Sequence, residues 1–278
     1  MRHVTEIPTT LGAHFHVAQS GALGIGRGRT DAADLTRPFH GVRSIERPTT
    51  FIETVRAYLP RLRDGQRFIG RTAVRLWQLP HPRPWRPGEP LEIAVAPDRS
   101  PPRARGVSGR RLLESRAQTC RVQGAPAVDP VAAVLSLVPR LSTGELIVLF
   151  DALVTTSVNY PGLDIVRRPI LTTEEIGERM DEWGRFPGAV VARRALGSTR
   201  EAVESPKATQ TRLMIVAAGL PEPTIQHEVW AGREFVARID LSYPRSLIGI
   251  EYEGDGHRTD KAQWRRDVAR QRRLEDLG

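Results

Sequence analysis

The chain has 278 residues, which is long enough for two domains with well-packed cores. Its 41 lysine and arginine residues outnumber 32 aspartate and glutamate residues, and the formal net charge of +9 suits either a polyanionic partner or a solvated basic surface. The single cysteine, Cys120, excludes an internal disulfide and a multi-cysteine zinc site, and the absence of a long apolar run or a signal-peptide pattern predicts a cytoplasmic protein without membrane contact.

The first 48 residues predict a small helical region. The expected elements are a helix over 16–23, a glycine turn over 24–26, a second helix over 27–35 and an extended wing over 36–43. This order resembles the winged helix-turn-helix that opens antitoxins of the type IV AbiEi family, whose second helix would enter the major groove of DNA. The resemblance implies DNA contacts for Arg27 and Arg29. A purely structural helical module is the alternative.

Residues 49–198 predict a middle region of mixed α/β structure. The expected helices span 51–58, 71–77, 130–138, 142–155, 172–180 and 190–196, and the expected strands lie near 68–69, at 91–96 and at 117–122. The proline-rich residues 80–90 and the basic residues 97–109 predict surface loops. Asp129 before Pro130 is a helix start signal. The series of strand, turn, Asp-Pro and helix resembles the middle region of AbiEi-like proteins.

The densest chemical signal lies in a predicted hairpin near the C-terminus. Period-2 alternation predicts strands over 235–241 and 248–253, which are joined by a turn that contains a proline. If the strands pair, Asp240, Glu251 and Glu253 converge at one end of a small sheet. This arrangement would gather three carboxylates. One predicted helix, over about 207–219, precedes the hairpin, and a second helix follows it.

Carboxylates that are folded together repel one another unless a cation lies between them. Magnesium or manganese suits such oxygen ligands, so we expect Asp240, Glu251 and Glu253 to bind Mg²⁺ or Mn²⁺. His257, in the turn after the second strand, would accept a proton from the attacking water. The alternative is that Glu251 and Glu253 form the solvent face of an edge strand and that His257 is an ordinary loop residue.

Residues 199–278 resemble the Vsr-like nuclease domain of unknown function, which has the PD-(D/E)xK restriction-endonuclease fold. The motifs are Asp240, then Ile-Glu-Tyr-Glu-Gly-Asp-Gly-His, then a polar helix. The resemblance implies magnesium-dependent hydrolysis of DNA phosphodiester bonds. It implies that Asp240 bridges the metal, that Glu251 is the acid of the (D/E)xK half-motif and that His257 is the histidine of the Vsr-like variants.

Two positions depart from that family pattern. Glu253 stands where lysine is usual, and Lys207 lies in the first helix, where family members carry a carboxylate. These departures favour the alternative of a non-catalytic DNA-binding regulator or antitoxin-like protein with a degenerate nuclease domain, and a structural protein without nucleic-acid contact is a third hypothesis. Family members continue beyond the position of Gly278 with a strand and a helix, so we expect an incomplete sheet. The alternatives are a fragment, a truncated gene product, or a chain whose sheet a protein partner or oligomer completes.

The helix that follows the hairpin, over about 260–277, carries a row of arginines. Spacing of three and four residues places several of them on one stripe beside the carboxylates. The residues expected to contact DNA phosphates are Arg265, Arg266, Arg270 and Arg273. The alternative is that these arginines pair with acidic residues of the same helix on a solvated surface.

Overall fold

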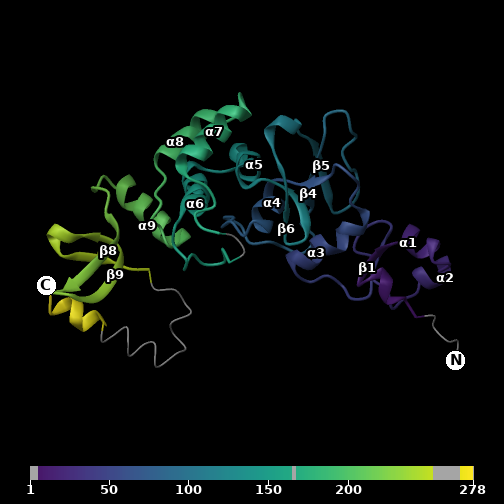
Figure 1. Ribbon diagram of the computed structural model, residues 1–278, viewed down its shortest axis with the longest axis horizontal. Helices are drawn as coiled ribbons and strands as arrows, with labels where there is room; N and C mark the ends of the chain where they lie inside the picture. The colour runs from purple at the N-terminus through teal and green to yellow at the C-terminus, as the bar shows by residue number, and fades with distance from the viewer. Residues whose placement is uncertain (1–5, 165–166, 253–269, 278) are drawn as a thin grey trace. The chain divides into compact units, whose positions relative to one another are not determined.

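A computed structural model describes residues 6–164, 167–252 and 270–277 of the chain (Figure 1). The chain divides into two units, one of residues 1–140 with 179–187 and one of residues 141–178 with 188–278. The mixed α/β class is confirmed, and the predicted boundaries near 48 and 198 stay predictions. Within the described residues, none of the helices is long and apolar enough to span a bilayer. Cys120 is a free thiol, and burial raises its pKa.

The N-terminal part of the first unit is built on a two-stranded antiparallel sheet of β1 (His14–His16) and β2 (Val42–Ser44). Helix α1 (Val17–Ala22) begins at the His16 cap, but α2 (Arg27–Thr30) is a single turn, so the predicted helix over 27–35 is wrong in extent. Tertiary contacts end it, because the Arg43 guanidinium binds the carbonyl oxygen of Thr30 and the carboxylate of Asp31.

A five-stranded mixed sheet forms the core of the first unit, in the order β5-β4-β3-β7-β6. Its strands are β3 (Arg67–Phe68), β4 (Leu91–Val95), β5 (Val107–Arg111), β6 (Thr119–Val122) and β7 (Ala125–Val128). The helices of this part are α3 (Phe51–Tyr58), α4 (Gly70–Leu76) and α5 (Pro130–Leu135). Every residue of β4, which lies between β5 and β3, is buried.

Two strands of this sheet were not predicted. β5 falls partly in the expected loop over 97–109, because its polar sequence lacks the apolar alternation of a strand. It forms by pairing in parallel with β4, and the backbone of Pro102 packs so closely on Gly109 that a Cβ there would lie 2.6 Å from the Pro102 carbonyl oxygen. β7 is short and contains Pro126, so the sequence gives little sign of it. The predicted helix start at Asp129 is confirmed, since its carboxylate accepts from the Ala132 N–H.

The second unit is built on helices α6 (Thr143–Val154), α8 (Ala189–Gly197) and α9 (Pro206–Ala217), and α7 spans Thr173–Trp183. A buried ionic network holds α9 to α6. Asp151 of α6 is fully buried and accepts from the Thr209 hydroxyl at 2.7 Å, while the Arg212 guanidinium lies 3.4 Å from the same carboxylate oxygen. Arg212 also binds Glu222 at 2.7 Å, so a single side chain connects the helix pair to the segment before the sheet.

A three-stranded antiparallel sheet completes the described part of the second unit, in the order β10-β9-β8. Its strands are β8 (Thr224–Ala231), β9 (Glu234–Tyr243) and β10 (Ile248–Ile250). The predicted hairpin is confirmed as the β9–β10 pair, but the second strand ends at Ile250 and not at 253. Residues 270–275 form a helix after the sheet.

Candidate active site

The described part of the predicted carboxylate site lies where β9 and β10 end their pairing. Ile250 pairs with Leu241, so Asp240 and Glu251 are the next residues along the two strands. The two oxygens of Asp240 accept from neutral donors: Oδ1 from the Gln226 side-chain amide at 3.1 Å and Oδ2 from the Tyr252 backbone N–H at 3.4 Å. The described hydrogen-bond donors to the Asp240 carboxylate are therefore neutral groups, which orient it without supplying a positive charge.

Glu251 has a different neighbour. Its Oε2 lies 2.6 Å from Nη2 of Arg270, in the helix after the sheet. Arg273, one turn further, binds Glu234 of β9, while Gln271 donates to Glu275 within the helix. The expectation that these arginines pair with acidic residues of their own helix is wrong for Arg270 and Arg273, which pair with carboxylates of the sheet region.

Lys207 also approaches this end of the sheet. It lies in the first turn of α9, and its Nζ is 5.7 Å from the ring centroid of Tyr252, the residue whose backbone N–H binds Asp240. A cation at that distance is attracted to the ring face, which gives the lysine a fixed neighbour. The position that departs from the family pattern in the first helix therefore brings a positive charge beside the carboxylate-bearing strands.

Several predicted site residues lie outside the described residues: Glu253, His257, Arg265 and Arg266. Among the residues that the structure does describe, no group of three or more His, Cys, Asp or Glu side chains is arranged to hold a metal. Asp240 and Glu251 offer oxygen donors alone, and Mg²⁺ binds proteins through one or two carboxylates with water completing its shell. The described residues thus fit a magnesium ion through this pair, with Glu253 as a third candidate.

The predicted DNA contacts of the N-terminal region rest on a short helix. Arg29 forms a two-pronged ion pair with Asp34, with both N–O distances at 2.9 Å, and its side chain is 12% exposed. Arg27 is exposed at the first position of α2. Because α2 is a single turn and Arg29 is engaged by a carboxylate, Arg27 is the better placed of the two arginines to meet a phosphate.

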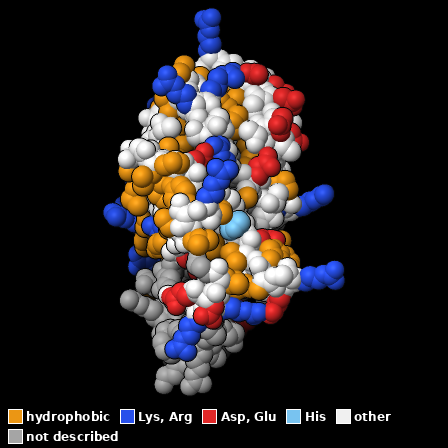
Figure 2. Space-filling view, turned by 90° about the vertical axis from the view of Figure 1, so that its left-hand side faces the viewer, with side chains coloured by type: hydrophobic (Ala, Val, Ile, Leu, Met, Phe, Trp, Pro, Cys, Tyr) orange, Lys and Arg blue, Asp and Glu red, His pale blue; other side chains and the backbone are white. Residues whose placement is uncertain are grey.

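Charge is mixed on the face drawn in Figure 2. Lysine and arginine side chains are interspersed there with acidic and hydrophobic ones and do not merge into one basic surface. The net charge of +9 is therefore not gathered on that face. On that face, contacts with a polyanion would come from local groups of arginines and not from a single broad patch.

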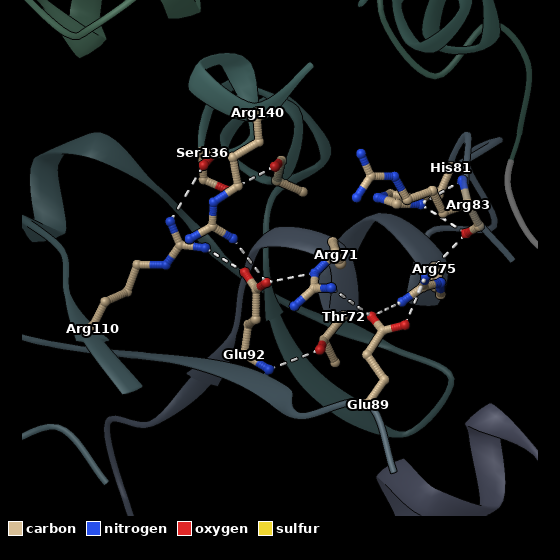
Figure 3. Close-up of polar contacts among 11 residues, drawn as sticks. Arg71, Thr72, Arg75, His81, Arg83, Glu89, Glu92, Arg110, Ser136 and Arg140 are labelled. Atoms are coloured by element: carbon tan, nitrogen blue, oxygen red, sulfur yellow. Dashed lines mark hydrogen bonds and ion pairs between the residues drawn. The ribbon is translucent and has the colours of Figure 1, made fainter. Parts of the chain in front are cut away.

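One such group, in the first unit, was not predicted. The carboxylate of Glu92, in β4, is 3% exposed and contacts three guanidinium groups: Arg71 of α4 at 2.8 Å, Arg110 of β5 at 2.5 Å and Arg140 at 3.2 Å (Figure 3). Burial raises the pKa of Glu92, but the arginines outweigh it and the net shift is downward. Burial also lowers the pKa of Arg110, with Glu92 opposing that effect.

This group, which we call the Glu92 cluster, consists of Arg71, Arg75, Glu89, Glu92, Arg110 and Arg140. Its members come from segments that are up to 69 positions apart, between Arg71 and Arg140, so periodicity within one segment could not reveal it. Two features of the sequence could have indicated the cluster. Arg71 and Arg75 are spaced to lie on one helix face, and a glutamate stands in an otherwise apolar strand.

Comparisons with known proteins give distant similarities. No family model matches the chain. The uncharacterized protein Rv2248 of Mycobacterium tuberculosis strain H37Rv and the uncharacterized protein MT2308 of strain CDC 1551 are each 30% identical to it over 91 residues. That match spans 33% of this chain and 34% of each relative, so the chain spans about a third of the relatives' length.

A solved structure also shows weak similarity to this chain. The crystal structure of the Rv2827c protein from M. tuberculosis aligns with a TM-score of 0.43 and 18% identity over 81% of this chain and 90% of that chain. The chain is thus distantly similar to mycobacterial proteins, two of which carry the name uncharacterized.

Proposed function

We propose that the second unit contains a magnesium-dependent DNA endonuclease site of the Vsr-like kind, in which Asp240 and Glu251 bind the metal. The observation that carries the proposal is the β9–β10 register, since it brings together two carboxylates that are eleven positions apart and that the resemblance names independently. Asp240 is supported because its hydrogen-bond donors, the Gln226 amide and the Tyr252 N–H, are neutral.

The residues of the chain have separate roles in this proposal. Magnesium, when bound, lowers the pKa of its water and balances charge on the phosphoryl group. Asp240 and Glu251 hold the ion, and Glu253 assists them. His257 would accept a proton from the attacking water, whose oxygen bonds to phosphorus while the P–O bond to the leaving nucleotide breaks. The leaving oxygen would take a proton from a solvent water. Lys207 offers its charge to the phosphate in place of the lysine that the strand lacks.

The test is plasmid nicking with Mg²⁺ by the full chain and two variants. Asp240→Asn keeps the shape of the side chain but removes its charge, so we expect nicking to fall by at least about 100-fold. Glu228→Gln makes the same kind of change at an exposed position of β8 in the same sheet and should leave nicking unchanged. EDTA should abolish nicking by the wild type. Equal nicking by Asp240→Asn and wild type would reject the assignment.

A second candidate is a non-catalytic DNA-binding regulator or antitoxin-like protein with a degenerate nuclease domain. The Arg270–Glu251 ion pair at 2.6 Å favours it, because a guanidinium already balances one of the two carboxylates. This candidate predicts duplex binding that weakens with salt, persists in EDTA and persists in Asp240→Asn. Undetectable duplex binding at low salt would reject it and would favour a structural role without nucleic acid.

A further inference from the structure

The Glu92 cluster contains more positive than negative charge. Glu89 is bound by Arg75 through both oxygens, at 2.6 and 3.3 Å, and by Arg71 at 3.3 Å. Glu92 is bound by Arg71, Arg110 and Arg140. Four guanidinium groups therefore face two carboxylates, and because Arg75 balances Glu89, the excess lies at Arg110 and Arg140. One guanidinium would be enough to balance Glu92 as a buried structural charge.

The excess cations lie on the solvent side of the carboxylate. The Glu92 side chain is 3% exposed, whereas Arg140 is 58%, Arg71 is 32% and Arg110 is 31% exposed. Each guanidinium has five N–H donors in a planar fork. Arg140 gives Nη1 to Glu92, and Arg110 gives Nη2 to Glu92 and Nη1 to the Ser136 carbonyl oxygen, so each fork has N–H groups that these bonds do not use.

The arrangement is fixed by the backbone beneath it. Gly70 has a φ of +59°, and a Cβ there would lie 1.9 Å from Oε2 of Glu92 and 2.6 Å from Nη2 of Arg110. The carboxylate and the guanidinium thus occupy the space that a side chain at position 70 would take. The Thr72 hydroxyl accepts from the Glu92 backbone N–H at 2.9 Å, which fixes the strand to α4. Glu92 holds the arginines in place before any ligand arrives, which lowers the entropy cost of binding.

From this geometry we infer that the outer face of Arg110 and Arg140, with Arg71 at its side, is a binding site for a phosphate group, and that the phosphates of a DNA backbone are its ligand. Guanidinium forks match phosphoryl oxygens in pairs, and a preorganised pair binds them more strongly than a lone surface arginine. The inference concerns the first unit and does not depend on cleavage by the second.

The experiment measures binding of a labelled duplex of about 20 base pairs to the full chain in EDTA, between about 50 and 200 mM salt. Arg140→Ala should weaken binding on the order of 10-fold at low salt and reduce the slope of log affinity against log salt by about 0.9. Arg140→Lys keeps the charge without the fork and should recover part of the affinity. Arg99→Ala is the matched control, because it removes one arginine that is 76% exposed in the same unit.

Titration of inorganic phosphate, followed by NMR shifts of arginine side chains, separates the two sources of phosphate. Loss of both duplex affinity and phosphate shifts in Arg140→Ala, but not in Arg99→Ala, supports the site on a DNA backbone. Phosphate shifts that depend on Arg140 with unchanged duplex affinity overturn DNA as the ligand and retain a site for a free phosphate group. Unchanged results in both assays, with Arg140→Ala as stable as wild type, overturn the site itself.

Discussion

Glu92 and Asp240 are both carboxylates on sheet strands, but they lie in opposite electrostatic surroundings. Glu92 is almost fully buried and faces three guanidinium groups, which hold its pKa down. Asp240 is half-buried and is held by the amide of Gln226 and the N–H of Tyr252. The first carboxylate is already balanced by cations, whereas the described donors of the second orient it without supplying a positive charge.

The difference separates two kinds of ligand. A carboxylate that is surrounded by arginines cannot recruit a metal ion, but it can arrange those arginines for an anion. A carboxylate that is oriented by neutral donors keeps its charge for a cation. We therefore propose an anion site in the first unit and a cation site in the second, and four predictions test that contrast.

The largest effect should come from removing each carboxylate in turn. Glu92→Ala leaves three guanidinium groups without their shared partner, so we expect it to destabilise the first unit by about 3 kcal/mol, the low end for a broken buried pair because the arginines are partly solvated. Asp240→Ala loses hydrogen bonds to neutral donors at a half-buried site and should cost about 1 kcal/mol or less. Urea unfolding measures both, and equal midpoint shifts would contradict the contrast.

The next largest effect concerns Lys207. Replacement by Met keeps the length of the side chain but removes the charge, so nicking with Mg²⁺ should fall by roughly 10- to 100-fold if the lysine contacts the phosphate. Lys207→Arg, which keeps the charge, should retain part of the activity. An unchanged thermal midpoint shows that the fold is intact. Equal nicking by Lys207→Met and wild type would remove Lys207 from the site.

A smaller effect is the opposite pH dependence of two buried carboxylates. The pKa of Glu92 is lowered in the folded chain, so its stabilisation is present above the unfolded value of 4.5 and is lost as the pH falls below it. Burial raises the pKa of Asp151 above 3.8, so its contribution is present below that pH and is lost as the pH rises through the folded value.

Glu92→Gln and Asp151→Asn test these signs. Urea unfolding between about pH 7 and about pH 3 should show that acid reduces the stability of the wild type relative to Glu92→Gln and increases it relative to Asp151→Asn. The difference in the free energy of unfolding between variant and wild type should therefore change with pH in opposite directions for the two variants. Changes in the same direction would contradict the assigned pKa shifts.

The smallest effect should come from Arg273→Ala. Its pair with Glu234 is exposed, so the urea midpoint should not change measurably. If Arg273 contacts a phosphate, its loss should reduce the slope of log affinity against log salt for duplex binding by about 1. Gln271→Ala, on the same helix, is the control for loss of side-chain volume. A salt dependence equal to that of wild type would exclude Arg273 from the DNA interface.

The sequence predicted best where one short segment contains the whole signal. The β9–β10 hairpin follows from alternation on either side of a proline-containing turn, and its register places Asp240 beside Glu251. The helix starts at Asp129 and Ser142 follow from side chains that bind N–H groups of the first helical turn. Each of these features depends on residues that are close in sequence.

The sequence predicted poorly where structure depends on distant partners. β5 forms because β4 is available to pair with it, and α2 stops at Thr30 because Arg43 binds its end. The Glu92 cluster joins residues of β4, α4 and β5 with Arg140. Ion pairs between elements depend on how the elements pack, and the pattern within one segment does not contain that information.

The anchoring of α9 has a consequence for dynamics. Arg212 is 2% exposed and is bound by Glu222, by the Ser198 carbonyl oxygen and, at longer distance, by Asp151. The backbone of α9 should therefore exchange its amide hydrogens slowly, and Lys207 should move only through rotation of its own side chain. Substitutions deep in the helical core, far from the carboxylates, would then alter the reach of that lysine without touching any residue of the strand end.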